Sequence, residues 1–301
     1  MTRGTTLRGL ARRVRDGVAG ERLQDGIRRH VLGQRRRELA RRRAFGPADL
    51  ERLDAILRQA ESVVSVRTLL ELPAGQRSPR LVVLRHDTDN DIDNAVRFAE
   101  WEAARGYRAS YYVLHTDWYY RDGFAGPPSR YVLRALERVA HLGHEIGLHN
   151  NAITVALRTG RDPIEVLSTE LDHLRRAGFD VTGTAAHGDA LCRTCGYNNG
   201  EVFIEAARPA HGPAGRRIAC EDPVSGAALR TELQPVTMAS LGLTYEANFI
   251  GNRYYLTDWW AFQGEPLRVG AGADARDSLA DPLPCPTRTA PTCLRWVRRG
   301  E

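Results

Sequence analysis

Two closely spaced acidic residues follow a short apolar run at Leu81–Asp91, which reads L-V-V-L-R-H-D-T-D-N-D. Asp87 and Asp89 are two positions apart, so on an extended backbone their carboxylates project to the same side. Converging carboxylates repel each other unless they share a proton or hold a cation between them. Hard carboxylate oxygens suit a divalent metal. Helix capping by Asp91 or Asp93 is the alternative explanation, but it accounts for only one or two of these acids.

The apolar run before these acids predicts a strand, because it is short and rich in Val and Leu. Strands buried on both faces have this composition in parallel sheets that helices cover on each side. Further strands are predicted at Arg108–His115, His144–Asn151, Val181–His187, Tyr245–Ile250 and Tyr254–Asp258, and helices at Pro47–Leu72, Asn90–Arg105, Pro127–Leu142 and Asp162–Ala177. This alternation predicts an α/β fold with a parallel sheet or barrel.

Polar residues end three of the predicted strands, at Asp87/Asp89, His149-Asn150-Asn151 and His187-Gly188-Asp189. In a parallel barrel the carboxyl ends of the strands meet on one face, where active sites lie. His144 and His149 are an odd number of residues apart, so they point to opposite faces of their strand. We therefore predict that His149 faces the site and that His144 is a structural histidine.

The motifs R-H-D-T-D at Arg85–Asp89 and H-E-I-G-L-H at His144–His149 resemble those of the polysaccharide deacetylases of the NodB-homology class. The likeness covers about residues 80–260 and is strongest to the branch whose first motif is D-x-D. It implies a distorted (β/α) barrel of about seven parallel strands and a bound divalent metal, most often zinc. It also implies hydrolysis of an N-acyl group, acetyl or formyl, on an amino sugar or glycoconjugate.

By position, the resemblance makes Asp87 the catalytic base, and Asp89 and His149 metal ligands. The chain departs from the family where the second metal histidine is expected, because Ile153 stands there. The late histidine that serves as general acid and the arginine of the third motif are absent. His187 is our candidate third ligand, since catalytic zinc sites use three protein ligands and one open position. His86 is conjectured to be the acid that protonates the leaving amine.

Two other functions compete with this interpretation. Asp87-Thr88-Asp89 also fits the D-x-D motif of a metal-dependent glycosyltransferase, although that function leaves His149 and His187 without a role. The missing histidines fit a non-catalytic carbohydrate-binding relic of the barrel, in which Trp118, Tyr119, Tyr120, Trp259 and Trp260 would stack on sugars. For the deacetylase-like function, the residues expected to contact substrate are Arg85, Asn150, Asn151, Gly188, Asp258 and Trp260.

Composition sets the domain organisation. The chain has 301 residues, of which 42% are hydrophobic and 27% charged, as in ordinary globular proteins. Residues 1–45 hold fourteen Arg and four acidic residues, which predicts a basic, partly helical extension before a barrel domain at 46–301. Such an extension could contact an anionic membrane surface, whereas no feature indicates a specific nucleic-acid partner.

Five cysteines occur in the chain: Cys192, Cys195, Cys220, Cys285 and Cys293. Cys192 and Cys195 have the C-x-x-C spacing of a zinc knuckle or redox pair, which Cys220 and His211 could complete as a zinc site. No apolar run reaches the ~20 residues of a membrane span, and no secretory signal is recognisable. We therefore expect a cytoplasmic protein, with free thiols in that reducing compartment.

Overall fold

The computed structural model describes residues 47–73, 76, 81–89, 91–122, 125–206, 215–223 and 225–250, together with three later strands at 254–257, 268–271 and 292–297. The chain divides into two units, Met1–Gly46 and Pro47–Glu301. The first unit lies outside the described residues, and so does the predicted Arg-rich helical extension.

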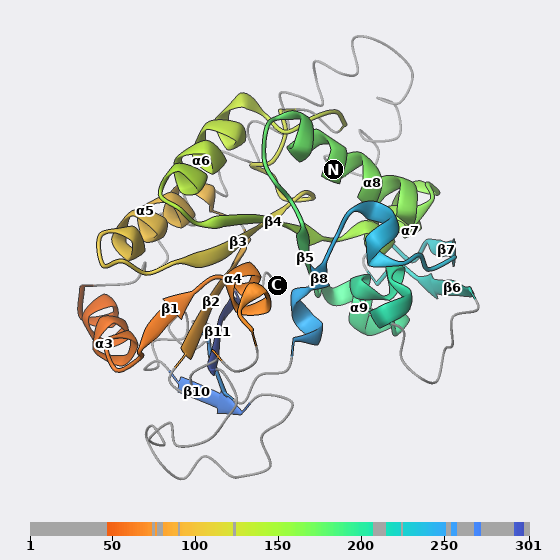
Figure 1. Cartoon of the computed structure of the whole chain (residues 1–301). Coiled ribbons are helices and arrows are strands. Elements are labelled where there is room, and N and C mark those ends of the chain that lie inside the picture. The colour runs from red at the N-terminus through yellow and green to blue at the C-terminus, as the bar shows by residue number, and fades with distance from the viewer. Residues whose placement is uncertain are drawn as a thin grey trace, which may run out of the picture. The chain divides into compact units, whose positions relative to one another are not determined.

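The second unit is built on a curled parallel sheet that forms a half-barrel (Figure 1). Its six strands are adjacent in the order β1-β2-β3-β4-β5-β8. They are β1 (Ser62–Val64), β2 (Leu81–Thr88), β3 (Ala109–Leu114), β4 (Glu145–Asn150), β5 (Gly183–Ala186) and β8 (Tyr245–Glu246). Strand β11 (Thr292–Val297) also pairs with β2 in parallel, off this path. The prediction of a parallel α/β sheet is thus confirmed at the level of a half-barrel.

Helices connect the strands. Most of them cover the outer side of the sheet, whereas α4 packs against the interior beside Val83, Tyr112 and Tyr245 (Figure 1). They are α3 (Pro47–Leu57), α4 (Val66–Glu71), α5 (Ile92–Ala103), α6 (Arg130–His141), α7 (Ala152–Thr159), α8 (Pro163–Arg176) and α9 (Ala190–Cys195). Side-chain caps begin several of them: Asp91 accepts from the Asn94 amide at α5, and Asp162 accepts from two amides at α8. Capping satisfies amides that the helix leaves unpaired.

The remaining elements are short and follow α9. They are the 3₁₀ turns η2 (Asn199–Val202), η3 (Ile204–Ala206), η4 (Met238–Leu241) and η5 (Ala247–Phe249), and the strands β6 (Arg216–Glu221), β7 (Ala228–Leu233), β9 (Tyr254–Thr257) and β10 (Arg268–Ala271). β6 pairs with β7, and β9 with β10, each as an antiparallel hairpin. The sequence analysis predicted a strand at Tyr254–Asp258, which corresponds to β9, but it predicted neither hairpin.

Two predicted boundaries were wrong. The helix expected over 47–72 is interrupted by β1, and Ser65 then caps α4 by accepting from the Thr68 amide. The three residues of β1 pair with the start of β2, so a contact with a distant strand outweighs the local helical pattern. The strand expected over 245–250 ends at Glu246, where η5 begins.

Two tyrosines fill the half-barrel interior below the strand ends. Tyr112 and Tyr245 are buried, and their hydroxyl groups are 2.8 Å apart. Glycines stand opposite both rings: a Cβ on Gly147 would lie 2.4 Å from the Tyr112 ring, and one on Gly183 would lie 2.0 Å from Tyr245. Glu145 accepts from the Tyr245 hydroxyl. Glycine is therefore required here by close approach, and the tyrosines form the floor of the interior.

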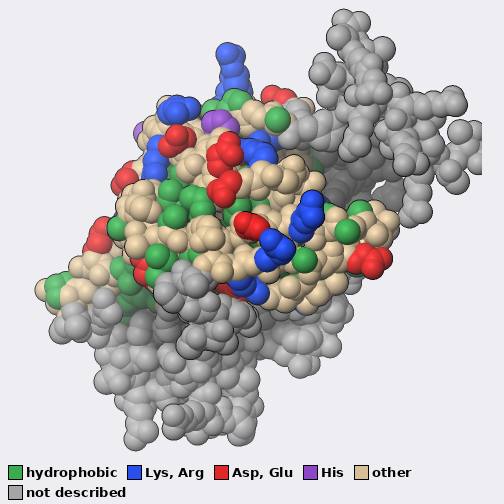
Figure 2. All heavy atoms as spheres, turned by 90° about the vertical axis from the view of Figure 1, so that its right-hand side faces the viewer, with side chains coloured by type: hydrophobic (Ala, Val, Ile, Leu, Met, Phe, Trp, Pro, Cys, Tyr) green, Lys and Arg blue, Asp and Glu red, His purple; other side chains and the backbone are tan. Residues whose placement is uncertain are grey.

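The surface of the described residues carries scattered apolar side chains and charges of both signs. Large apolar side chains are exposed only at scattered positions of the described residues, namely Leu70, Tyr131 and Ile204. On the face shown in Figure 2, acidic and basic side chains are interspersed. Among the described residues, no helix combines the length and apolarity needed to cross a bilayer.

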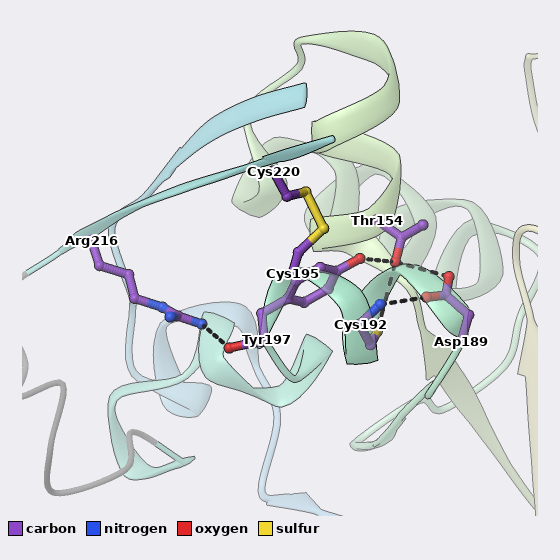
Figure 3. The surroundings of a disulfide bond; sticks show 8 residues. Thr154, Asp189, Cys192, Cys195, Tyr197, Arg216 and Cys220 are labelled. Atoms are coloured by element: carbon purple, nitrogen blue, oxygen red, sulfur yellow. Dashed lines mark hydrogen bonds between the residues drawn. A yellow bond between two sulfur atoms is a disulfide. The ribbon is translucent and has the colours of Figure 1, made fainter. Parts of the chain in front are cut away.

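A disulfide bond joins Cys195, at the end of α9, to Cys220 in β6 (Figure 3). Cys192 carries a buried free thiol. The expectation of free thiols was wrong for Cys195 and Cys220, and a zinc site using these two sulfurs is excluded because they bond to each other. Disulfides are rare in reducing compartments, so this bond weighs against a cytoplasmic location. Cys285 and His211 lie outside the described residues, as does the side chain of Cys293.

Removing this disulfide should destabilise the protein without unfolding it. The cysteines are 25 residues apart, for which loop-closure entropy corresponds to about 3 kcal/mol. We expect the Cys195→Ser/Cys220→Ser variant to lose about that much unfolding free energy in urea titrations. A reductant should lower the melting temperature of the wild-type protein but leave that of the variant unchanged. Equal sensitivity of both proteins to reductant would contradict the assignment.

Candidate metal centre

Three side chains from three strand ends converge inside the half-barrel: Asp89 after β2, His149 in β4 and His187 after β5. His149 Nε2 lies 3.1 Å from His187 Nδ1 and 3.5 Å from Asp89 Oδ1, and His187 Nδ1 lies 3.8 Å from Asp89 Oδ2. Asp89 and His149 are buried, and His187 is partly exposed. The three residues thus present one carboxylate and two imidazoles to a common point.

Backbone contacts fix the orientation of His149. Its Nδ1 donates to the Ala185 carbonyl at 2.7 Å, so the lone pair of Nε2 points toward Asp89 and His187. Burial lowers the pKa of His149 to about 3, despite the opposing effect of the nearby Asp87 charge. A metal-binding histidine must be neutral and is commonly oriented by a second hydrogen bond of this type. His149 meets both conditions.

The donor set fits a divalent metal such as zinc. Zinc bonds to histidine nitrogen and carboxylate oxygen are about 2.0–2.2 Å long, so two ligands of a tetrahedral ion lie about 3.3–3.5 Å apart. The separations above bracket this value, and the three donor atoms all lie within 4.8 Å of one another. Nitrogen and oxygen donors in this ratio also match three-ligand catalytic zinc sites. This is the one such group found among the described residues.

Asp87 lies beside this group in a buried ion pair. Arg85 Nε donates to Asp87 Oδ1 at 2.7 Å, and an Arg85 Nη atom donates to Oδ2 at 2.9 Å. Burial alone would lower the pKa of Arg85, but the adjacent Asp87 charge outweighs it and raises that pKa. Asp87 Oδ2 is 3.9 Å from His149 Nε2. The guanidinium thus fixes the Asp87 carboxylate at the edge of the metal centre.

Asn248 links this ion pair to β5. Its Oδ1 accepts from Arg85 Nη1 at 2.7 Å, and its Nδ2 donates to the Ala186 carbonyl at 2.9 Å. Glu246 accepts from the Ala186 amide and from the Asn248 amide. Each of the three Arg85 nitrogens donates a hydrogen bond inside the protein, and two of these bonds hold the Asp87 carboxylate. The expected contact of Arg85 with substrate stays a prediction. Asn248 lies within the strand predicted at Tyr245–Ile250, and no sequence signal singled it out.

His86 lies on the opposite face of β2, as strand alternation requires. Its Nε2 is 2.7 Å from Glu102 Oε1 of α5, and Tyr111 donates to the other Glu102 oxygen at 2.7 Å. His144 accepts from the Ala109 amide and donates to the Ala99 carbonyl. The placement of His86 argues against the conjectured acid role. The location of His144 outside the site agrees with its predicted structural role.

The remaining predicted site residues divide into three groups. Asn150 accepts from the Ala152 amide and donates to the Asn199 carbonyl, and the Asn151 side chain contacts Thr116 and Asn199. Both asparagines are buried, so they hold the strand ends in place instead of facing a ligand. Gly188 is exposed next to His187, where it remains a substrate-binding candidate. Asp258 and Trp260 lie outside the described residues, as does Trp259.

The aromatic residues after β3 have mainly structural roles. Tyr119 and Tyr120 are buried, and the Tyr119 hydroxyl donates to the Thr88 carbonyl just before Asp89. Trp118 is partly exposed and packs edge-on against Tyr119, with ring centroids 6.0 Å apart. Of these three residues, Trp118 alone retains the exposure needed to stack on a sugar.

His115 is a polar strand-end residue that the sequence analysis did not assign to the site. It follows β3, is buried, and accepts from the Asn151 amide at 3.0 Å. Its Nδ1 is 4.0 Å from Glu170 Oε1, and Glu170 also binds Arg121. Its place at the end of the strand predicted at Arg108–His115 was a signal of the same kind as for His149. His115 thus supports the segment that follows His149.

Comparison of the chain with protein-family models, with curated proteins and with solved structures finds no match in any of the three.

Replacing His115 by Gln should make the metal-free protein less sensitive to acid. Burial lowers the pKa of His115 to about 4, against about 6.5 in an unfolded chain. Between these values the unfolded state binds a proton that the folded state does not, so stability falls as pH falls. As the pH falls from 6 to 4.5, we expect the free energy of unfolding to decrease less steeply in the variant than in the wild type. The difference in slope should be about 1.4 kcal/mol per pH unit.

Urea unfolding at a series of pH values measures this slope. Exposed His141 provides the control, and His141→Gln should retain the wild-type slope. If plots of unfolding free energy against pH were parallel for His115→Gln and wild type, His115 would have the same pKa in the folded and unfolded states, and the prediction would be wrong.

Proposed function

We propose that this protein is a metal-dependent hydrolase that removes an N-acyl group, acetyl or formyl, from an amino sugar. The observation that carries the proposal is the convergence of Asp89, His149 and His187 on one point, next to the ion-paired carboxylate of Asp87. The motif resemblance to polysaccharide deacetylases supports the substrate class. The half-barrel with β11 beside β2 is compatible with the distorted barrel of about seven strands that this resemblance implies.

In this proposal Asp89, His149 and His187 would hold the metal, and their donor atoms suit zinc. When bound, such an ion supplies a Lewis acid that lowers the pKa of a water molecule and polarises a carbonyl group. Asp87 is the general base that accepts the proton of the attacking water. Its two hydrogen bonds from Arg85 hold the carboxylate in a fixed orientation. As Ile153 is buried in α7, it takes no part in this chemistry.

In this mechanism Asp87 takes up the proton of the water and later returns it to the leaving nitrogen. Water adds to the acyl carbon, the carbon–nitrogen bond breaks, and the nitrogen must gain a proton to leave as an amine. Because His86 faces α5, we assign this proton return to Asp87, which then acts as base and acid in turn. The products are a carboxylic acid and a free amino sugar.

A glycosyltransferase function has less support. It would use Asp87 and Asp89 as a D-x-D pair around a loosely held metal with a nucleotide. In the structure Asp87 is occupied by Arg85, while Asp89 faces two histidines. Imidazole nitrogens favour zinc over magnesium, and hydrolysis is the chemistry that a zinc site of this composition serves most directly.

Substituting any of the three proposed ligands should abolish metal retention. Asp89→Ala, His149→Ala and His187→Ala each leave two protein ligands where catalytic zinc sites normally use three. We expect near-stoichiometric zinc in the wild-type protein after loading and dialysis, and a loss of at least ten-fold in affinity for each variant. Elemental analysis and competition with a chromophoric chelator measure this. His173→Ala, on α8, is the control and should retain the metal. Full occupancy in the three variants would rule out the site.

The hydrolase function can be tested by acetate and formate release from a small panel of N-acetyl and N-formyl amino sugars. Zinc-loaded wild-type protein should release acid from at least one of them. Asp87→Asn should retain zinc and lose activity by a factor on the order of 10²–10⁴, because an amide cannot accept the proton of water. Metal binding without release from any sugar would favour the non-catalytic relic, and an active Asp87→Asn would show that another group is the base.

A further inference from the structure

The distance between the two histidines depends on how the chain is held just after β4 and β5. His149 pairs with Ala185 in the sheet, but His187 lies beyond the last paired residues, Asn150 and Ala186. The His187 amide donates to the Asn150 carbonyl at 2.8 Å, which leaves its own carbonyl to another partner. That partner is Asn199, a fully buried residue that begins η2.

The Asn199 side chain caps the helix that follows His149. Its Oδ1 accepts from the Ile153 amide at 2.9 Å and from the Thr154 amide at 3.3 Å. The residue at the N-cap position of α7, Asn151, makes no side-chain capping hydrogen bond of its own. The Asn199 carbonyl also accepts from Asn150 Nδ2 at 2.9 Å. A residue nearly fifty positions away thus supplies the cap of α7 and holds the end of β4.

The same side chain holds the segment that follows β5. Asn199 Nδ2 donates to the His187 carbonyl at 2.9 Å and to Asn151 Oδ1 at 2.9 Å, and it is 3.3 Å from Cys192 Sγ. The oxygen of this amide therefore binds the chain after His149, and its nitrogen binds the chain at His187. Any shift of one segment relative to the other breaks at least one of these hydrogen bonds.

We propose that Asn199 is a positioning residue that sets the separation of His149 and His187 and thereby the metal affinity of the centre. The inference rests on the proposed metal site. Asn199 contacts neither histidine ring and would not touch the ion. Its effect comes from fixing the two strand ends, because a tetrahedral site tolerates ligand displacements of only a few tenths of an ångström.

The position of Asn199 is itself well fixed. Asn198 caps η2 by accepting from the Gly200 amide, and Glu201 completes a reciprocal capping box with Asn198. Glu201 also binds Arg216 of β6, the strand that the disulfide bond joins to α9. Figure 3 shows the surroundings of the disulfide, where Thr154 of α7 contacts Tyr197 and Asp189. These contacts hold the turn that carries Asn199, and they thereby fix the position of its side-chain amide.

Asn199→Asp separates the two functions of the side chain. An aspartate keeps oxygens that accept from the Ile153 and Thr154 amides, and the N-terminus of a helix favours a negative charge. It has no N–H to donate to the His187 carbonyl or to Asn151 Oδ1. Asn198→Asp is the matched control, since it makes the same change one residue earlier, and aspartate is as good a cap as asparagine.

Cobalt and zinc affinities of the full chain provide the readout, together with the visible absorption of bound cobalt, which reports the ligand geometry. Substitutions that disturb the orientation of metal ligands typically weaken binding about 10- to 100-fold. We expect that loss and an altered cobalt spectrum in Asn199→Asp, and wild-type values in Asn198→Asp. The melting temperatures of the metal-free proteins show whether a general loss of stability is responsible.

Wild-type affinity and spectrum in folded Asn199→Asp would overturn the proposal. If that variant does not fold, neutral Asn199→Ser takes its place with the same expected loss of affinity. If neither folds, Asn199 is a determinant of folding, and the positioning role is wrong. A wild-type protein that binds neither cobalt nor zinc would remove the proposed function and this inference together, whereas equal binding by wild type and variant removes only the inference.

Discussion

The buried ion pair of Arg85 and Asp87 is the constraint on which the rest of the site depends. A single charge inside the half-barrel would cost several kcal/mol in lost hydration, so neither residue can be buried without the other. The pair is further satisfied by Asn248, which connects it to the β5 backbone at Ala186. Charge burial thus couples the candidate base on β2 to the strand that leads to His187. The chemistry of the site and the packing of the sheet are consequently set by the same contacts.

Strand alternation sorts the polar residues of β2 and β4 into two clusters with different roles. Asp87 and His149 face the interior, where they lie next to Asp89 and His187. His86 and His144 face α5 on the other side, where Glu102 lies close to both rings. The outer cluster fastens the helix to the sheet through paired polar groups. The inner cluster is open on the side of partly exposed His187 and is therefore able to meet a ligand.

Residues from the segments after the central strands complete the centre. Asn199 joins the ends of β4 and β5, and His115 supports Asn151 after β4. The disulfide between Cys195 and Cys220 holds β6 to α9, next to the turn that presents Asn199. In metal sites, outer residues of this kind orient the ligands and so tune the affinity. In the proposed hydrolase they would also keep Asp87 at a fixed distance from the metal.

The sequence alone determined which strands end in polar residues and which side of each strand those residues occupy. Asp87, Asp89, His149 and His187 follow from that periodicity, since the pleat has a period of two and parallel strands align their carboxyl ends. Only the tertiary structure decided that Arg85 and Asn151 are occupied internally, that His86 faces α5, and that Cys195 pairs with Cys220. It also placed Asn199 and Asn248 in the site. Those outcomes depend on contacts between residues far apart in the chain, and local pattern carries no information about which distant partner satisfies a buried polar group.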